Sequence, residues 1–228
     1  MRNEVLWGIM MVLNFGLITF AHAKFGKVGL FVCIAMSGII ANIQVVKTVE
    51  LFGMVATLGN IVYGTSFLAT DILSECYGEK DAKKGVYIGM FSIFGMTMLM
   101  SLALVFVPHE LDFAHSSLAV VFELMPRVAL ASFVAYFVSQ RHDVWAYSFW
   151  KSKHNKTWIS NNASTIVSQA IDSVVFVLIA FLGVMPTSVL FEIFITTYIL
   201  KLIVAVLDTP FVYLAKRIKG QNKVEGSS

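Results

Sequence analysis

Long apolar runs separated by short polar connections make up most of the chain. Six runs are clearly bounded, at residues 5–21, 28–46, 51–70, 85–107, 158–185 and 189–214. Each is about long enough to cross a hydrocarbon core of roughly 30 Å as an α-helix, which rises about 1.5 Å per residue. Backbone groups find no water inside lipid and must be satisfied within a helix, and the alternation typical of a membrane barrel is absent. The pattern therefore predicts an all-α integral membrane protein.

A further run has bounds that the sequence leaves open. Its strongly apolar part, residues 128–139, is too short to cross a bilayer alone. It extends either back through residues 118–128, where Pro126 would kink the helix, or forward through residues 144–150. In the second case Arg141, His142 and Asp143 interrupt it at the interface. Either version gives a bundle of about seven transmembrane helices.

Composition agrees with this class and argues against several others. Of the 228 residues, 57% are hydrophobic and 14% are charged, whereas roughly a quarter of a soluble domain is charged. Cys33 and Cys76 form no CxxC pair, so neither a disulfide framework nor a zinc site is expected. The chain has no Walker A loop, HExxH or GxSxG motif, so we expect no enzyme activity, no cofactor and no metal.

The positions of the basic residues predict the orientation. The connections after the first, third and fifth runs, together with the C-terminal tail, contain thirteen Lys and Arg residues, whereas the N-terminus and the other connections contain three. The positive-inside rule then puts the N-terminus outside a bacterial cell membrane and the C-terminus in the cytoplasm. The net charge of +3 thus reflects orientation signals, and no nucleic-acid partner is expected.

A polar stripe in the sixth run is the main candidate for a functional site. Charged groups inside a span cost roughly 2.5–3.5 kcal/mol each on insertion scales, so a carboxylate there needs a reason. Helical spacing puts three uncharged polar residues on the same face of this run as the carboxylate, and two amides flank that face. The alternative is a stripe that only joins helices. The face consists of Asn161, Thr165, Ser168 and Asp172, and the flanking amides are Asn162 and Gln169.

Lys201 lies near the middle of the seventh run, and we expect it to pair with Asp172 or with Asp208. A purely structural ion pair remains an equal alternative. Pro210 follows Asp208 closely and predicts a kink there.

Other polar residues gave weaker signals. Asp71 and Glu75 follow the third run near the cytoplasmic interface, and solvated side chains at a helix end explain them equally well. Arg127 either pairs with Glu123, four residues earlier, or lies at the outer interface. The isolated polar residues of the early runs are explained by hydrogen bonds between helices. These are Asn14, Asn42, Gln44 and Asn60.

Three ordered blocks resemble the bacterial queuosine precursor transporters, also called the VUT family. The first runs from Phe67 to Gly78, and the second from Pro126 to Gln140 and on to Asp143. The third begins at Asn161 and ends at Phe181. The resemblance covers roughly residues 30–215. The family usually has six spans and a cytoplasmic N-terminus. We therefore expect residues 1–27 to form an extra N-terminal helix and basic loop, and residues 28–215 to form the family-like bundle. Residues 216–228 are expected to be a basic cytoplasmic tail.

The resemblance implies import of 7-cyano-7-deazaguanine, 7-aminomethyl-7-deazaguanine or both. The candidate substrate-binding residues are those of the polar stripe and the charged residues near it. An alternative is a substrate-binding subunit of an energy-coupling-factor transporter, which acts with an ATPase partner on another vitamin-like compound. A membrane-embedded enzyme is a weaker alternative, and the oligomeric state stays open. In full, the candidate residues are Asp172, Gln169, Ser168, Asn161, Asn162, Lys201, Asp71, Glu75, Arg127 and Asp208.

Overall fold

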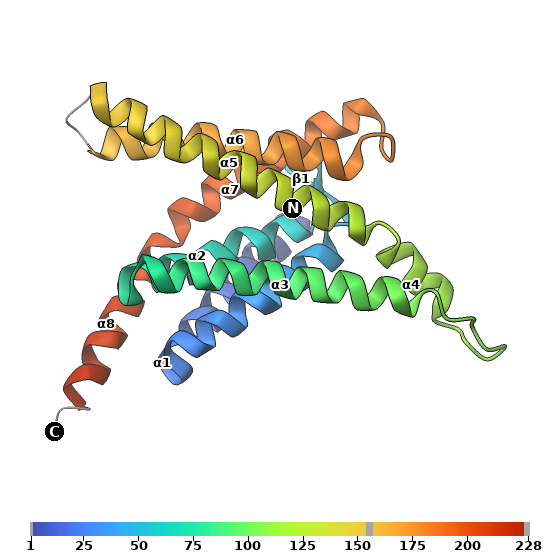
Figure 1. The fold of residues 1–228 in the computed structure, drawn as a ribbon, viewed down its shortest axis with the longest axis horizontal. Coiled ribbons are helices and arrows are strands. Elements are labelled where there is room, and N and C mark those ends of the chain that lie inside the picture. Colours follow the sequence, from blue (N-terminus) through green and yellow to red (C-terminus); the bar gives the residue numbers. More distant parts are fainter. Residues whose placement is uncertain (1, 154–156, 226–228) are drawn as a thin grey trace.

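The protein is a bundle of long helices with one small β-hairpin (Figure 1). The computed structural model describes residues 2–153 and 157–225. In chain order the elements are α1 (Arg2–Gln44), β1 (Thr48–Leu51), β2 (Met54–Thr57), α2 (Gly59–Tyr77), α3 (Glu79–Ala103), α4 (His115–Phe122), α5 (Met125–Lys153), α6 (Thr157–Phe181), α7 (Thr187–Leu207) and α8 (Thr209–Glu225).

The first two predicted runs form α1, which reverses direction at Gly26. This glycine has φ 57° and ψ −137°, a non-helical conformation that a residue with a side chain rarely adopts. In a straight helix Ala21 and Gly29 would lie roughly 12 Å apart along the axis. A Cβ added at Gly29 would instead lie 2.3 Å from the carbonyl oxygen of Ala21. The two halves of α1 are therefore packed against each other as a hairpin.

The third predicted run starts too early. Residues 48–57 pair as an antiparallel hairpin, and α2 begins only at Gly59 and continues to Tyr77. Phe52 and Gly53, the turn residues, have φ values of 54° and 77°, as a tight primed turn requires. The hairpin is fixed to α7, because the Val55 N–H donates to Glu192 Oε2 at 2.9 Å and the Thr196 hydroxyl donates to the Val55 carbonyl at 3.1 Å. An apolar stretch that reads as helix thus becomes a strand pair with partners far along the chain.

The ambiguous run is resolved by a break before Pro126. The short helix α4 ends at Phe122, and α5 begins at Met125 and continues through Arg141 to Lys153. Proline fits the first turn of a helix, where its missing N–H has no partner to lose. The expected kink beside Pro210 is also present, because α7 ends at Leu207 and α8 starts at Thr209.

Two apolar clusters form the interior. One lies among α1, α2, α3 and the α7–α8 segment, and the other among α5, α6, α7 and the β-hairpin. In Figure 1, α5 and α6 run side by side, and α7 and α8 continue diagonally past α2. Both α7 and the β-hairpin contribute to the two clusters, the hairpin through Leu51 and Ala56 in the first and Val55 in the second, so these two elements join the halves of the bundle.

Much of the outer surface suits a lipid environment. Large apolar side chains on α1 and α3 face outward, among them Leu13, Phe91 and Phe94. Four helical stretches in the described residues are long and apolar enough to cross a membrane, and Ile166–Phe181 is a shorter apolar one. The four are Arg2–Gln44, Glu79–Ala103, His115–Ser139 and Thr187–Ile218.

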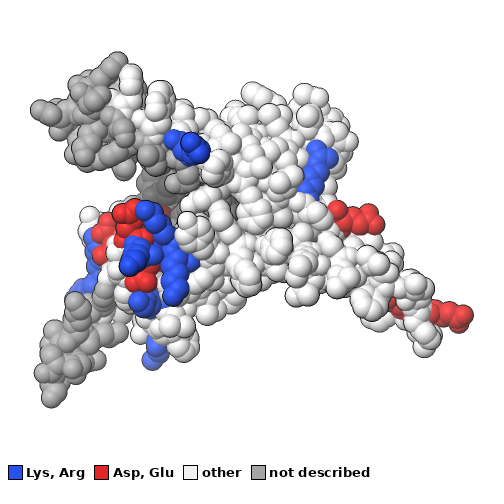
Figure 2. Space-filling view, in the orientation of Figure 1, with Lys and Arg blue, Asp and Glu red and all other residues white. Residues whose placement is uncertain are grey.

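Charged side chains gather at one end of the molecule. Figure 2 shows them where α2 meets α3, while the middle of this face carries almost none. Three ion pairs lie there: Lys27 with Asp81, Lys83 with Glu79, and Lys216 with Glu75. The connection between α2 and α3, the reversal of α1 and the middle of α8 therefore lie at the same end.

Candidate functional site

A buried ion pair lies at the centre of the bundle. Lys201 Nζ on α7 is 2.5 Å from Asp172 Oδ2 on α6, and the two residues are 7% and 8% exposed. A five-residue turn, residues 182–186, joins these antiparallel helices, so residues near the middle of each can meet. Of the two partners expected for Lys201, the structure selects Asp172.

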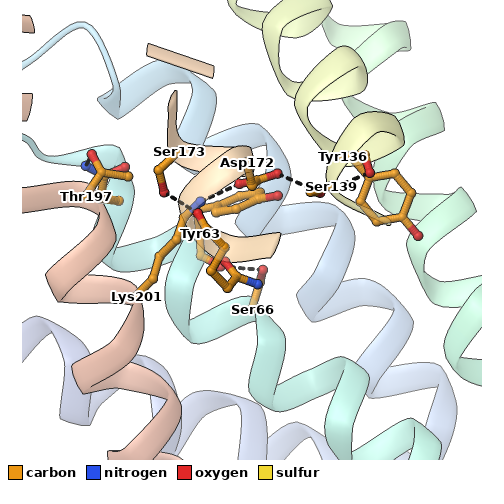
Figure 3. A network of polar contacts seen from close by, with 10 residues as sticks. Tyr63, Ser66, Tyr136, Ser139, Asp172, Ser173, Thr197 and Lys201 are labelled. Carbon is orange, nitrogen blue, oxygen red and sulfur yellow. Dashed lines mark hydrogen bonds and ion pairs between the residues drawn. The ribbon is translucent and has the colours of Figure 1, made fainter. Parts of the chain in front are cut away.

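The ion pair is held in place from two further helices (Figure 3). The Ser139 hydroxyl on α5 donates to Asp172 Oδ1 at 3.3 Å. On the other side, Lys201 Nζ lies 5.5 Å from the centroid of the Tyr63 ring on α2, a distance at which an ammonium is attracted to the ring face. Four helices thus meet at one pair of charges.

A small cavity of about 30 Å³ opens beside the ion pair. A cavity of this size holds about one or two water molecules. Its polar lining includes residues from α1, α2, α5, α6 and α7, and its apolar lining includes Val45 and Val128 of the second apolar cluster. These residues are Asn42, Asn60, Tyr63, Ser132, Asp172, Thr197 and Lys201.

Two amides in this lining behave differently. Asn60 Nδ2 donates to the Thr197 hydroxyl at 2.7 Å, which joins α2 to α7 as an interhelical hydrogen bond. Asn42 Nδ2 donates to the Gly38 carbonyl of its own helix at 2.8 Å, but Asn42 Oδ1 is buried and has no hydrogen-bond partner. A buried acceptor without a partner is costly, which makes this oxygen a candidate acceptor for an N–H donor of a ligand.

The stripe on α6 is only partly described. Ser168 Oγ lies 3.0 Å from Nδ1 of His142, which joins α6 to α5, and Gln169 Oε1 is buried without a partner. Neither residue lines the cavity beside Asp172. The side chains of Asn161, Asn162 and Thr165 lie outside the described part of the chain.

The other candidate residues lie away from the ion pair. Arg127 donates from Nε to the Ile179 carbonyl at 2.6 Å and from Nη2 to the Leu182 carbonyl, so it caps the C-terminal end of α6. Glu75 is exposed and pairs with Lys216 at the charged end. Asp71 is exposed on α2, and Asp208 is buried at the break between α7 and α8. None of these four lines the central cavity.

Sequence reasoning missed several members of the site. Asn42 and Asn60 are single polar residues in apolar runs, so they form no periodic signal, and only the packing brings them together with Asp172. Tyr63 carried no signal, and Ser139 was noted only as part of the block from Pro126 to Gln140. The pairing of a mid-membrane lysine with a carboxylate was the one feature that helical depth could reveal.

The residues that line the central cavity combine opposite charges with uncharged polar groups. The residues that line it include a carboxylate on α6, an ammonium on α7 and, on α1, an amide whose oxygen has no hydrogen-bond partner. No cluster of three or more His, Cys, Asp or Glu side chains that could hold a metal ion occurs in the described residues. The carboxylate, the ammonium and the amide are groups that bind and orient a ligand by hydrogen bonds and charge.

Comparisons with known proteins agree with the three sequence blocks. A family model described as "Putative vitamin uptake transporter" matches residues 57–215. A Bacillus subtilis (strain 168) protein named "Probable queuosine precursor transporter" is 41% identical over 221 residues, which cover 96% of each chain. A Haemophilus influenzae protein with the same name is 30% identical over 132 residues, 57% of this chain and 54% of the relative. No solved structure matches significantly. Because the family model covers more than half of the chain and the Bacillus relative nearly all of it, the chain belongs to the vitamin uptake transporter (VUT) family.

Proposed function

We propose that this protein imports 7-deazaguanine precursors of queuosine, 7-cyano-7-deazaguanine, 7-aminomethyl-7-deazaguanine or both, across a bacterial cell membrane. The observation that carries the proposal is the 41% identity, over nearly the whole chain, to a protein named as a queuosine precursor transporter. Membership of a transporter family also sets the membrane-embedded enzyme aside.

The chemistry of the central cavity is compatible with this substrate. The pyrimidine edge of a guanine-like ring presents two adjacent N–H donors beside a carbonyl oxygen. A carboxylate accepts two such donors side by side, and an ammonium donates to the carbonyl. Asp172 and Lys201 lie 2.5 Å apart and offer this combination, and Asn42 Oδ1 is available for a further N–H.

Binding has to separate the ion pair or share it with the ligand. In the structure Asp172 and Lys201 neutralise each other, which is how buried charges are tolerated when no ligand is present. A substrate that offers both donors and an acceptor replaces these contacts one for one. A simple apolar ring would leave both charges without partners, so the pair selects against it.

The proposed topology has seven crossings, an outside N-terminus and a cytoplasmic C-terminus. The two halves of α1 supply two crossings, because a straight helix of 43 residues would measure about twice the thickness of a hydrocarbon core. Helices α2, α3, α5, α6 and α7 supply the others. The charged end at the α2–α3 connection would then face the cytoplasm.

Uptake in cells tests the substrate. A strain that cannot synthesise queuosine, supplied with 7-cyano-7-deazaguanine, should regain queuosine in its tRNA when this gene is expressed. Expression of an inactive variant at the same membrane level is the control. Absence of queuosine with normal amounts of protein in the membrane would refute the proposal.

Transport by purified protein separates a self-sufficient carrier from a subunit that needs an ATPase. In liposomes a carrier should move the labelled precursor down its gradient without ATP. Binding without movement, followed by transport once an ATPase partner is supplied, would support the energy-coupling-factor alternative.

A further inference from the structure

A second, larger cavity lies next to the central one. It has a volume of about 270 Å³ and lies among α1, α2, α3 and α5. Four aromatic side chains, Tyr63, Phe67, Phe133 and Tyr136, contribute to its wall. Near one end, Lys83 and Glu79 form an ion pair with side chains 68% and 78% exposed, so the cavity reaches the charged end of the molecule.

The two cavities share a wall. Tyr63 and Ser132 line both of them. The Tyr63 ring has Lys201 Nζ 5.5 Å from its centroid, and it meets the Phe67 ring edge-on at 5.4 Å. It therefore stands between the ion pair and the aromatic wall of the larger cavity.

The volumes indicate what each cavity can hold. Sites for small molecules usually measure roughly 300–1,000 Å³, so about 30 Å³ beside Asp172 admits water but no bicyclic ring. The larger cavity, at about 270 Å³, is close to the size of a small ligand site. Tyr63 is the large side chain that lines both cavities, so its movement would connect them.

We propose that the larger cavity is a second binding site for the transported molecule, a flat nitrogen-rich heteroaromatic ring, and that Tyr63 separates it from the Asp172–Lys201 site. The inference rests on the proposed function for the identity of the ligand. Aromatic side chains stack on such a ring whatever its polar edge, so this site holds the molecule less selectively than the ion pair does. With the orientation proposed above, it is the chamber through which the molecule leaves for the cytoplasm.

Cysteine labelling tests the second site. In a background with Cys33→Ala and Cys76→Ser, Ser66→Cys puts a thiol in the wall of the larger cavity with little change in size. Inside-out vesicles are treated with a charged thiol reagent, with and without 7-cyano-7-deazaguanine. Labelling should be about tenfold slower when the free ligand is at about ten times its Kd, because the unprotected fraction follows mass action.

Ser74→Cys is the matched control. Ser74 lies on the same helix, is exposed, and lines neither cavity. Its labelling rate should not change with the ligand. Equal rates with and without ligand at Ser66→Cys, in vesicles that transport normally, would overturn the second site and leave the proposed function intact. Vesicles that neither bind nor transport the compound would overturn both.

A second measurement tests whether Tyr63 separates the two cavities. Ala135→Cys puts a thiol in the smaller cavity only, behind Tyr63. Adding Tyr63→Ala should speed its labelling from the cytoplasmic side, whereas adding Tyr63→Phe, which keeps the ring, should not. Equal labelling in the Ala and Phe variants would refute the role of Tyr63. Because Ser66→Cys retains Tyr63, the first experiment stands even if Tyr63→Ala fails to fold.

Discussion

Replacement of Asp172 by Asn gives the sharpest test of the central site. The change keeps the shape of the side chain but removes the charge and one of its two acceptors. A hydrogen bond to a charged group contributes about 1.5–3 kcal/mol, and about 1.4 kcal/mol corresponds to a factor of ten in binding. If the substrate donates two N–H groups to Asp172, uptake at low substrate concentration should fall at least about tenfold.

Loss of the carboxylate also leaves Lys201 buried without its partner. Breaking a buried pair from one side typically destabilises a protein by about 3–5 kcal/mol. A fall in uptake could therefore come from poor folding. The double variant Asp172→Asn with Lys201→Met separates the two causes, because it removes both charges together.

We expect the double variant to regain thermal stability relative to Asp172→Asn alone, while its uptake stays at least about tenfold below that of the unaltered protein. The assay is initial uptake of labelled 7-cyano-7-deazaguanine, normalised to the amount of protein in the membrane, with thermal unfolding in detergent measured in parallel. Normal uptake by Asp172→Asn would refute the reasoning. The α6 stripe would then be a helix-packing feature, as its alternative interpretation holds.

Three further predictions concern other parts of the molecule. Reporter fusions after Lys83 and after Lys153 should both read cytoplasmic, and an external reading at Lys153 would overturn the proposed orientation. Asn42→Leu should reduce uptake about tenfold, because the unpaired acceptor is lost. Thermal stability should stay the same or rise, because a buried oxygen without a partner is removed. A loss of stability with normal substrate affinity would show a purely structural role. Arg127→Met should lower the free energy of unfolding by about 1.5–3 kcal/mol, because the cap on the C-terminal end of α6 is lost. The KM for uptake should stay unchanged. A raised KM in correctly folded protein would show that Arg127 takes part in substrate binding.

The helical membrane class was readable from the sequence because lipid imposes a length and a polarity on every span. The same rule explains the failure at residues 51–57. That stretch is as apolar as a span, but its turn at Phe52 and Gly53 and its bonds to Glu192 and Thr196 depend on partners far along the chain.

The candidate site could also be predicted only in part, because the ion pair was expected but the cavity beside it was not. Depth along α6 and α7 made Asp172 a partner for Lys201, yet Asp208, seven residues along the same helix as Lys201, was equally acceptable on spacing alone. The kink before Pro210 puts Asp208 at the end of α7, near α8. Asn42 and Asn60 could not be assigned to the site, because their role depends on the way α1 and α2 pack against α7.

The Asp172–Lys201 pair also affects how the chain is made. Ribosomes complete α6 before α7, so Asp172 reaches the translocon before its partner exists. A lone charge at the centre of a span costs roughly 2.5–3.5 kcal/mol on insertion, and the pair removes much of that cost once both helices are present. The short turn at residues 182–186 delivers α7 within a few residues of synthesis. Helices α6 and α7 are therefore expected to enter the membrane together as one hairpin, and a chain truncated before α7 should insert α6 poorly.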